Sequence, residues 1–213
     1  MAYKRSDLME QRIAANRDRI LQATRKLVAV GGFREAQIAA VAADAGVSTG
    51  LIYRYFPSKA ELFVEVLTAA VDGEVAVLRG IAKGPEPVAE RLGMAIDSFV
   101  HRAMAGPWLA YAFIAEPVDP EVDAERIRGR RRFCEVFRDL LQEGIESGEF
   151  AEQDPDVTAA CIVGAFTEAV VGPVAPQLKK AQDADRLAAS IREVCLRAAG
   201  STGARAGEDA AAR

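Results

Sequence analysis

The chain has 213 residues, of which 50% are apolar and 27% charged, a balance typical of a soluble protein of one or two domains. Its net charge of −4 hides an asymmetry: residues 1–60 hold ten Lys/Arg and five Asp/Glu, a net of +5, whereas residues 61–213 hold seventeen and twenty-six, a net of −9. The overall charge therefore does not exclude a nucleic-acid partner, and a surface that binds polyanions is expected near the N-terminus.

The N-terminal residues predict one polar segment followed by one helix. Residues 1–12 are polar, and the sequence leaves open whether they form an arm that orders on DNA or a solvated tail. Apolar residues at helical spacing predict a helix from Ile13 to Val30. Its inner stripe would consist of Ile13, Ile20, Leu21, Thr24, Leu27 and Val28. Gly31 and Gly32 would end this helix, and Phe33 is placed to fill the core of a three-helix head.

The segment from Gln37 to Lys59 predicts two short helices joined by a tight turn. Apolar residues at three-four spacing predict the first helix at 38–45, and Gly46 follows where a left-handed residue closes a helix. Ser48 is a suitable N-cap for the second helix, residues 49–56, which Pro57 ends. Two such helices form a helix-turn-helix, whose second helix enters the DNA major groove. The alternative, a packed helical hairpin, does not explain the hydrogen-bonding side chains around that helix.

The stretch AGVSTGLIYRYFPSKAELF, residues 45–63, resembles the DNA-binding signature of the TetR family of bacterial transcriptional repressors. The resemblance runs from Ala15 to Leu67. It implies a DNA-binding head and a larger helical body that binds a small-molecule effector and forms a homodimer. Two positions depart from the family pattern. Gln37 stands where Thr usually caps the helix and meets a phosphate, and Leu51 stands where Thr is frequent, so the operator should differ.

The resemblance assigns DNA contacts to residues around the second helix of the motif. Those expected to face base edges are Thr49, Leu51, Tyr53 and Arg54. Those expected to contact phosphates are Ser48, Tyr55 and Lys59, while Gly50 would allow close approach to backbone or DNA. Arg54 could chelate a guanine and Leu51 could pack on a thymine methyl group. The alternative for Arg54 is a solvated charge.

The rest of the chain also predicts helices, because no run of alternating β-branched residues lies between turn signals. These helices are expected at 59–78, 88–105, 107–115, 121–148, 155–171 and from Asp183 or Asp185 to 198. Ser58 and Glu61 would form a capping box, and Asp154 would cap a helix that begins with Pro155. The fold class is therefore all-α, with about nine helices. We expect a DNA-binding head at 1–60, an effector-binding and dimerisation body at 61–199 and a disordered tail at 200–213.

The expected helix at 155–171 is rich in small residues, which allow helices to approach closely. They are Ala159, Ala160, Gly164, Ala165 and Ala169. Together with the apolar stripe at 187–198, they would form a four-helix bundle across a homodimer, as the resemblance implies. The alternative is that this stripe belongs to the core of a single chain.

The resemblance also implies a small-molecule site among the bulky residues of the body. The candidates are Met94, Phe99, His101, Met104, Trp108, Tyr111, Phe137, Phe166 and Glu168. An aromatic stripe at helical spacing is more often core than pocket, and His101 could be a surface residue. Glu168 is a carboxylate within an apolar helix, which is costly unless paired, so it marks either a polar spot in the pocket or a dimer contact.

No motif predicts catalysis, a metal site or a cofactor, since the sequence lacks a nucleophile elbow, a phosphate loop and any ligand cluster at metal spacing. The three cysteines, Cys134, Cys161 and Cys195, lie in apolar helical patterns and are expected to be buried free thiols in a reducing cytoplasm, with redox sensing as the alternative. Residues 1–12 are polar, so we expect no N-terminal signal segment, and the most apolar stretch, residues 159–174, is interrupted by polar residues and proline.

The expected function is that of a cytoplasmic repressor that a small apolar effector releases from a palindromic DNA operator. Two alternatives remain. One is a DNA-binding regulator without an effector, and the other is a helical small-molecule-binding protein with a vestigial head.

Overall fold

The computed structural model describes residues 2–178 and 183–201, and the regular elements within them are all helical. The helices are α1 (Ala2–Glu35), α2 (Ile38–Ala45), α3 (Thr49–Tyr55), α4 (Lys59–Ala82), α5 (Val88–Ala105), α6 (Pro107–Ile114), α7 (Pro120–Glu146), α8 (Pro155–Val174) and α9 (Ala184–Ala198), with a 3-10 turn at Pro176–Leu178. The described part contains no strand and only an isolated bridge between Phe150 and Ser201. The predicted all-α fold with about nine helices is confirmed.

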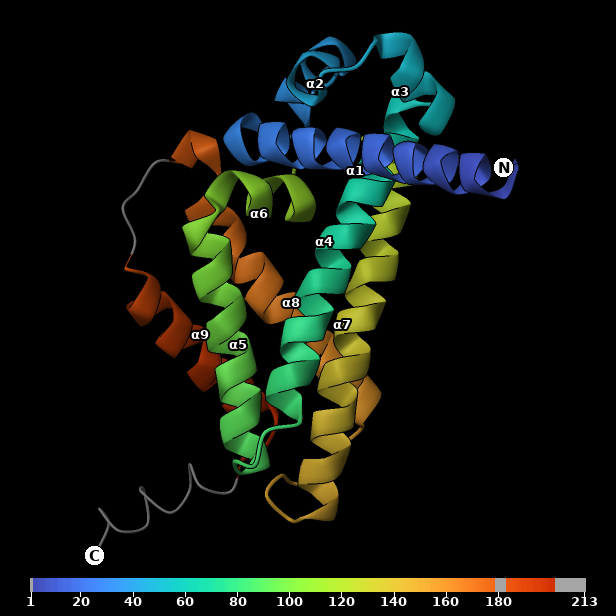
Figure 1. Cartoon of the computed structure of the whole chain (residues 1–213). Helices are drawn as coiled ribbons and strands as arrows, with labels where there is room; N and C mark the ends of the chain where they lie inside the picture. The colour runs from blue at the N-terminus through green and yellow to red at the C-terminus, as the bar shows by residue number, and fades with distance from the viewer. Residues whose placement is uncertain (1, 179–182, 202–213) are drawn as a thin grey trace, which may run out of the picture.

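Helices α1 to α3 form the head, which stands at the top of Figure 1 with α1 lying across the upper end of the body. Gly46 ends α2 with a φ of 65°, and its N–H is directed at the carbonyls of Ala42 and Ala43. The Ser48 hydroxyl then accepts a hydrogen bond from Leu51 N at 3.1 Å, which caps α3. The core beneath these helices is closed by Ile20, Val28, Val41, Ile52 and Phe56, all at most 1% exposed. The predicted helix-turn-helix is therefore present.

Helix α1 differs from the prediction at its N-terminal end. It begins at Ala2 instead of Ile13, so the segment expected to be an arm or a tail is helical. Ile13, expected on the inner stripe, is 46% exposed, so that expectation is wrong for this residue. The break after Val30 is confirmed: Gly31 and Gly32 leave helical geometry, and Gly32 has a φ of 76°.

The body consists of long helices that run away from the head, with α6 lying crosswise beneath α1 (Figure 1). Helix α4 packs against α7, α7 against α8, and α5 against α9. Their shared core is aromatic: Phe166 lies 4.7 Å from Phe99 and 5.3 Å from Phe137, measured between ring centroids. Residues at helical spacing on three helices thus meet in one cluster.

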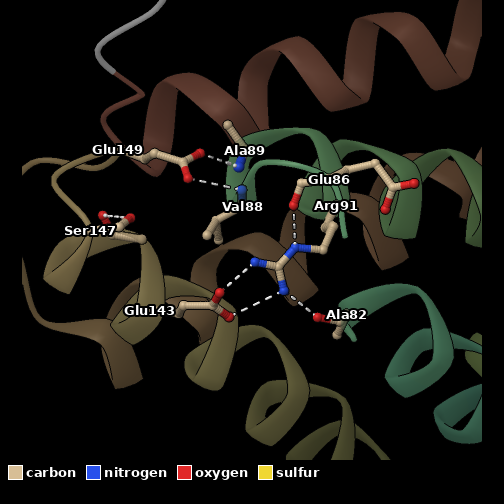
Figure 2. Close-up of polar contacts among 9 residues, drawn as sticks. Ala82, Glu86, Val88, Ala89, Arg91, Glu143, Ser147 and Glu149 are labelled. Carbon is tan, nitrogen blue, oxygen red and sulfur yellow. Dashed lines mark hydrogen bonds and ion pairs between the residues drawn. The ribbon is translucent and has the colours of Figure 1, made fainter. Parts of the chain in front are cut away.

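The end of the body far from the head is held by two carboxylates and one buried guanidinium (Figure 2). Arg91 donates to Glu143 at 2.5 and 3.1 Å and to the carbonyls of Glu86 and Ala82. Glu149 accepts the otherwise unpaired first N–H groups of α5, those of Val88 and Ala89, at 3.1 and 3.0 Å. Hydrogen bonding to Glu143 raises the pKa of Arg91, so this guanidinium stays charged. We call this group of contacts the distal clamp.

Several predicted helix bounds are too short. Helix α4 continues to Ala82 instead of ending at residue 78, and α8 continues to Val174 with Pro173 in its last turn. Asp183 caps α9, which decides between the two starting residues that the sequence allowed. Of the predicted tail, residues 202–213 lie outside the described residues, whereas Gly200 accepts a hydrogen bond from Ala151 N and Ser201 pairs with Phe150.

The cysteine prediction is wrong in part. Cys195 is buried, and burial raises its pKa to about 11, but Cys161 is exposed and Cys134 is half-buried. Helix α8 carries Cys161 on its outer side.

By length and composition α8 could cross a membrane, yet it packs on α5, α7 and α9, and 33% of its apolar window is buried within the described part of the chain.

Candidate DNA-binding interface and effector cavity

Helix α3 presents a polar outer face while one residue, Ile52, anchors its inner face in the head core. Thr49, Tyr53 and Arg54 are exposed on the outer side, Tyr53 to 50%. Among the described residues Arg54 has no hydrogen bond or ion pair, so its guanidinium is free to bind a base or phosphate. A Cβ atom at Gly50 would meet no atom of the described chain, so packing within the head does not require glycine there.

The other side chains predicted to contact DNA are less accessible or already bound within the protein. Leu51 and Tyr55 are half-buried, and the exposed Ser48 already uses its oxygen as the α3 cap. Lys59 donates to Gln37 Oε1 at 3.2 Å and lies 5.1 Å from the centre of the Phe63 ring. Gln37 does not cap α2, and it also donates to Arg34 O at 2.7 Å. A phosphate that binds Lys59 must therefore compete with the Gln37 amide.

The body contains a largely apolar cavity of about 150 Å³ between α4, α5, α6 and α7. Its walls include Leu67, Val71, Phe99, Leu109, Phe113 and Phe133. Of the nine ligand-binding candidates only Phe99 lines this cavity. Its polar lining includes Arg102 and Glu74, which form a bidentate ion pair with N–O distances of 2.7 to 3.1 Å.

The remaining candidates lie elsewhere. Trp108 and Tyr111 line a separate, more open cleft of about 790 Å³ between head and body, which Lys59 and Glu116 also line. Phe137 and Phe166 are completely buried in the aromatic core, and Met104 is half-buried against it. Met94, His101 and Glu168 are exposed, His101 beside Asp185. Helical spacing identified the inner faces but not the gap between them, because side-chain packing from neighbouring helices decides where space remains.

Glu116, at the end of α6, joins the body to the head. Its carboxylate accepts the N–H groups of Phe33 at 2.8 Å and Arg34 at 3.2 Å, directly after the Gly31-Gly32 break. A Cβ at Gly32 would overlap this carboxylate, so a side chain there would displace the end of Glu116, and the positive φ also favours glycine. The Phe33 ring packs 4.5 Å from Phe63, between ring centroids. The sequence contains no signal for this contact, because Glu116 is 83 residues away from Phe33.

Arg126 links this contact to the cavity. It is buried and lines the cavity wall, and it donates to the carbonyls of Ala112 at 2.5 Å, Phe113 at 3.1 Å and Glu116 at 2.6 Å. These carbonyls belong to the end of α6 and would otherwise lack partners. Burial lowers the pKa of Arg126, only partly offset by Asp123. The cavity, Arg126, the end of α6 and Glu116 thus form a continuous series of contacts that ends in the head, which we call the junction.

The small-residue stripe lies on α8, and most of it is on the exposed face of that helix. Ala159 is buried, but Ala160, Gly164, Ala165 and Ala169 are exposed, and a Cβ at Gly164 would meet no atom of the described chain. On α9, Val194 is also exposed. The alternative that these residues form the core of a single chain is therefore wrong for four of the five. Glu168 lies on the same exposed face and does not line the cavity.

Comparison with known proteins agrees with this geometry. Residues 20–66 match the model of the bacterial regulatory proteins of the tetR family, and residues 85–170 match the tetracyclin repressor-like C-terminal domain. The transcriptional repressor KstR of Mycobacterium tuberculosis is 32% identical over 127 residues, 55% of this chain, and the match spans 56% of that relative's length.

Two solved structures share the fold. FadR from Bacillus subtilis, in complex with stearoyl-CoA, superposes with a TM-score of 0.73 at 23% identity and covers 84% of this chain and 96% of its own. RolR, in complex with resorcinol, superposes with a TM-score of 0.70 at 23% identity and covers 93% and 94%. The two family models together with the helix-turn-helix head show that the chain belongs to the TetR family of bacterial transcriptional regulators.

Proposed function

We propose that this regulator is a cytoplasmic repressor that binds a palindromic operator as a homodimer and is released by a small, largely apolar effector. The observation that carries the proposal is the series of contacts at the junction, from the cavity wall through Arg126 and Glu116 to the backbone of the head. Residues 1–60 would be the DNA-binding unit and residues 61–199 the effector-binding and dimerisation unit.

The outer face of α3 would recognise the DNA sequence. Thr49, Tyr53 and Arg54 point into solvent there, as residues that reach base edges in a major groove must. Leu51 is half-buried, so it would contribute through its exposed part, by contact with a thymine methyl group. Ser48, Tyr55 and Lys59 would position the head on phosphates.

Dimerisation would use the exposed faces of α8 and α9. A palindromic operator has two half-sites, and a single head reads only one of them. The exposed small residues at 160, 164, 165 and 169 allow a second copy to approach α8 closely, and Val194 would lose water contact on α9. Glu168 would then lie at this interface instead of in the cavity.

Effector binding would enlarge the cavity. A volume of about 150 Å³ is small beside the 300–1,000 Å³ typical of ligand sites, so an effector must prefer a conformation in which the helices have moved apart. FadR and RolR, which share this fold, hold stearoyl-CoA and resorcinol, ligands with a long alkyl chain and an aromatic ring. Because α6 forms one wall and also carries Glu116 at its end, widening the cavity would move the head.

The DNA part of this proposal is tested by selecting a binding sequence from random DNA and measuring the affinity of variants for it. Arg54→Ala should weaken binding by about 1–3 kcal/mol and relax the choice at one base position. Lys59→Ala should weaken binding to operator and random DNA alike and lower the salt slope by about one. Arg131→Ala is the control, because Arg131 is exposed on α7, far along the chain from the head, and has no partner among the described residues. An equal loss on both DNAs for Arg54→Ala would contradict its role in reading bases.

A further inference from the structure

The apolar effector cavity has an unusual number of cations in its wall. Four arginines line it, Arg25, Arg102, Arg126 and Arg130, against a single carboxylate, that of Glu74. The formal charge of the lining is therefore +4 − 1 = +3. An uncharged ligand leaves this surplus of positive charge uncompensated, whereas an oxyanion both neutralises charge and accepts stronger hydrogen bonds from guanidinium groups.

Two of these arginines are already bound within the protein. Arg102 binds Glu74, and its remaining Nη1 donates to Ser98 Oγ. Arg126 donates to three backbone carbonyls. The only carboxylate in the cavity lining, that of Glu74, is therefore already paired with Arg102. Neither guanidinium can turn toward a ligand without breaking these contacts.

The other two, Arg25 on α1 and Arg130 on α7, have no hydrogen bond or ion pair with any residue in the part of the chain that the structure describes. Their situation differs from that of neighbouring arginines on α7, since Arg128 binds Glu125 and Arg132 binds Asp72. Both are exposed, which places them at the open side of the cavity. There a ligand group can replace water as their partner at little cost in desolvation.

We infer that the effector is an amphipathic anion, whose apolar part fills the cavity and whose oxyanion, a carboxylate or a phosphate, binds between Arg25 and Arg130. Guanidinium groups bind both oxyanions with paired hydrogen bonds. The inference rests on the proposed function, because it assumes that this cavity is the effector site.

The positions of the two arginines imply that the bound anion would also affect the position of the head. Arg25 belongs to the head and Arg130 to the body. An oxyanion held by both would form a direct bridge from α1 to α7. The head would then be held by the ligand at one place and by Glu116 at another, so the charged group would contribute to the change in head position as well as to affinity.

The inference is tested by calorimetric titration of the full-length protein with matched acids and alcohols. The probes are octanoate, octyl phosphate and 1-octanol, and the aromatic pair 3-phenylpropionate and 3-phenyl-1-propanol. We expect at least one acid to bind about tenfold or more tightly than its alcohol. This preference should disappear in Arg25→Gln and in Arg130→Gln and persist in Arg131→Gln, the neighbouring arginine that does not line the cavity. Comparing octanoate with octyl phosphate distinguishes a carboxylate from a phosphate.

Other outcomes overturn the inference. They are equal binding of acids and alcohols, a preference for acids that survives in both cavity variants, or no binding of any acid at millimolar concentration. A loss of operator affinity in ligand-free Arg25→Gln, with acid binding unchanged, would assign Arg25 to DNA instead. The proposed function fails separately: acids that bind through both arginines without changing operator affinity would leave the anion site standing and refute release by the effector.

Discussion

The two ends of the body are built from the same parts but differ in what surrounds them. At the distal clamp a glutamate, Glu149, accepts two backbone N–H groups, and a buried arginine, Arg91, holds helix-end carbonyls. At the junction Glu116 and Arg126 do the same. The difference is that Arg91 also has a two-pronged carboxylate partner and lies away from the cavity, whereas Arg126 lines it and has only a distant one, Asp123 at 3.7 Å.

This difference indicates how one body can be rigid at one end and responsive at the other. A guanidinium paired with a carboxylate is held by charge as well as by geometry, and moving it would leave a buried charge uncompensated. A guanidinium held mainly by carbonyls follows those carbonyls when their helix moves. The distal clamp should therefore contribute stability alone, and the junction should contribute both stability and communication with the head.

The largest effect is expected from breaking the distal clamp. Arg91→Ala removes a buried cation that holds Glu143 and two carbonyls, and should lower the free energy of unfolding by about 3 kcal/mol, the low end of the range for a buried pair because Glu143 is partly exposed. Urea denaturation measures this loss. The exposed pair of Arg79 provides the control, since Arg79→Ala should change stability by less than about 0.5 kcal/mol. Effector-dependent release from DNA should be unchanged in both, and altered release in Arg91→Ala would remove the distinction between the two ends.

The next largest effect is expected from removing the carboxylate at either end of the body, Glu116 or Glu149. Glu116→Ala and Glu149→Ala each leave two backbone N–H groups without their acceptor, and each should lose about 1–3 kcal/mol of stability. Only Glu116→Ala should also weaken the coupling between effector and operator, typically about 1–3 kcal/mol in such proteins. Operator affinity measured with and without effector gives this coupling. Equal coupling in the two variants would show that the junction does not carry the signal.

A smaller effect is expected from alanine at two glycines with positive φ, of which only Gly32 lies against Glu116. Gly46 has left-handed helical geometry, with φ 65° and ψ 39°, where alanine should cost about 1 kcal/mol in strain. Gly32, with φ 76° and ψ −173°, lies in a region that is nearly restricted to glycine, so alanine there should cost more, about 1–3 kcal/mol. A Cβ at Gly32 would in addition overlap the Glu116 carboxylate, whereas one at Gly46 would meet nothing within 4 Å. Gly32→Ala should therefore be the more destabilising in thermal unfolding and the only one to reduce coupling. The prediction is contradicted by similar behaviour of the two variants.

The smallest effect concerns pH, at the contact between α5 and α9. His101 Nδ1 lies 2.7 Å from Asp97 O and Nε2 lies 2.8 Å from Asp185 Oδ1, so only a protonated ring can donate to both. These bonds, chiefly the one to Asp185, raise the pKa of His101, and the nearby charges are Asp97, Asp185 and the Arg192 that binds Asp97. The stabilisation from these bonds is fully present below the pKa that His101 has in the unfolded chain. It is lost as the pH rises through the higher pKa that His101 has in the folded protein.

Because both side chains of this pair are exposed, the loss should be no more than about 0.5 kcal/mol. Unfolding measured between pH 5 and 8 should show it, and Asp185→Asn should remove most of it. A pH dependence that is identical in Asp185→Asn would assign the titration to another group.

The DNA-binding head was predictable from sequence because its signals are local. A glycine at the end of α2 and a serine at the start of α3 act on residues within four positions, and the apolar spacing that buries Ile52 leaves Thr49, Tyr53 and Arg54 outside. The helices of the body followed from spacing in the same way, with errors at their ends. The assignment of ligand residues stays a prediction for Phe99, while the other eight do not line the cavity.

The sequence by itself determined the helical class, the position and polarity of α3 and the asymmetry of charge, because capping, periodicity and composition act over a few residues. Only the tertiary structure decided which bulky side chains enclose space, that Glu116 holds the head and that Arg126 connects it to the cavity. These contacts join residues from 10 to 83 positions apart on different elements. Such pairings depend on how whole helices cross, and no local pattern encodes the crossing.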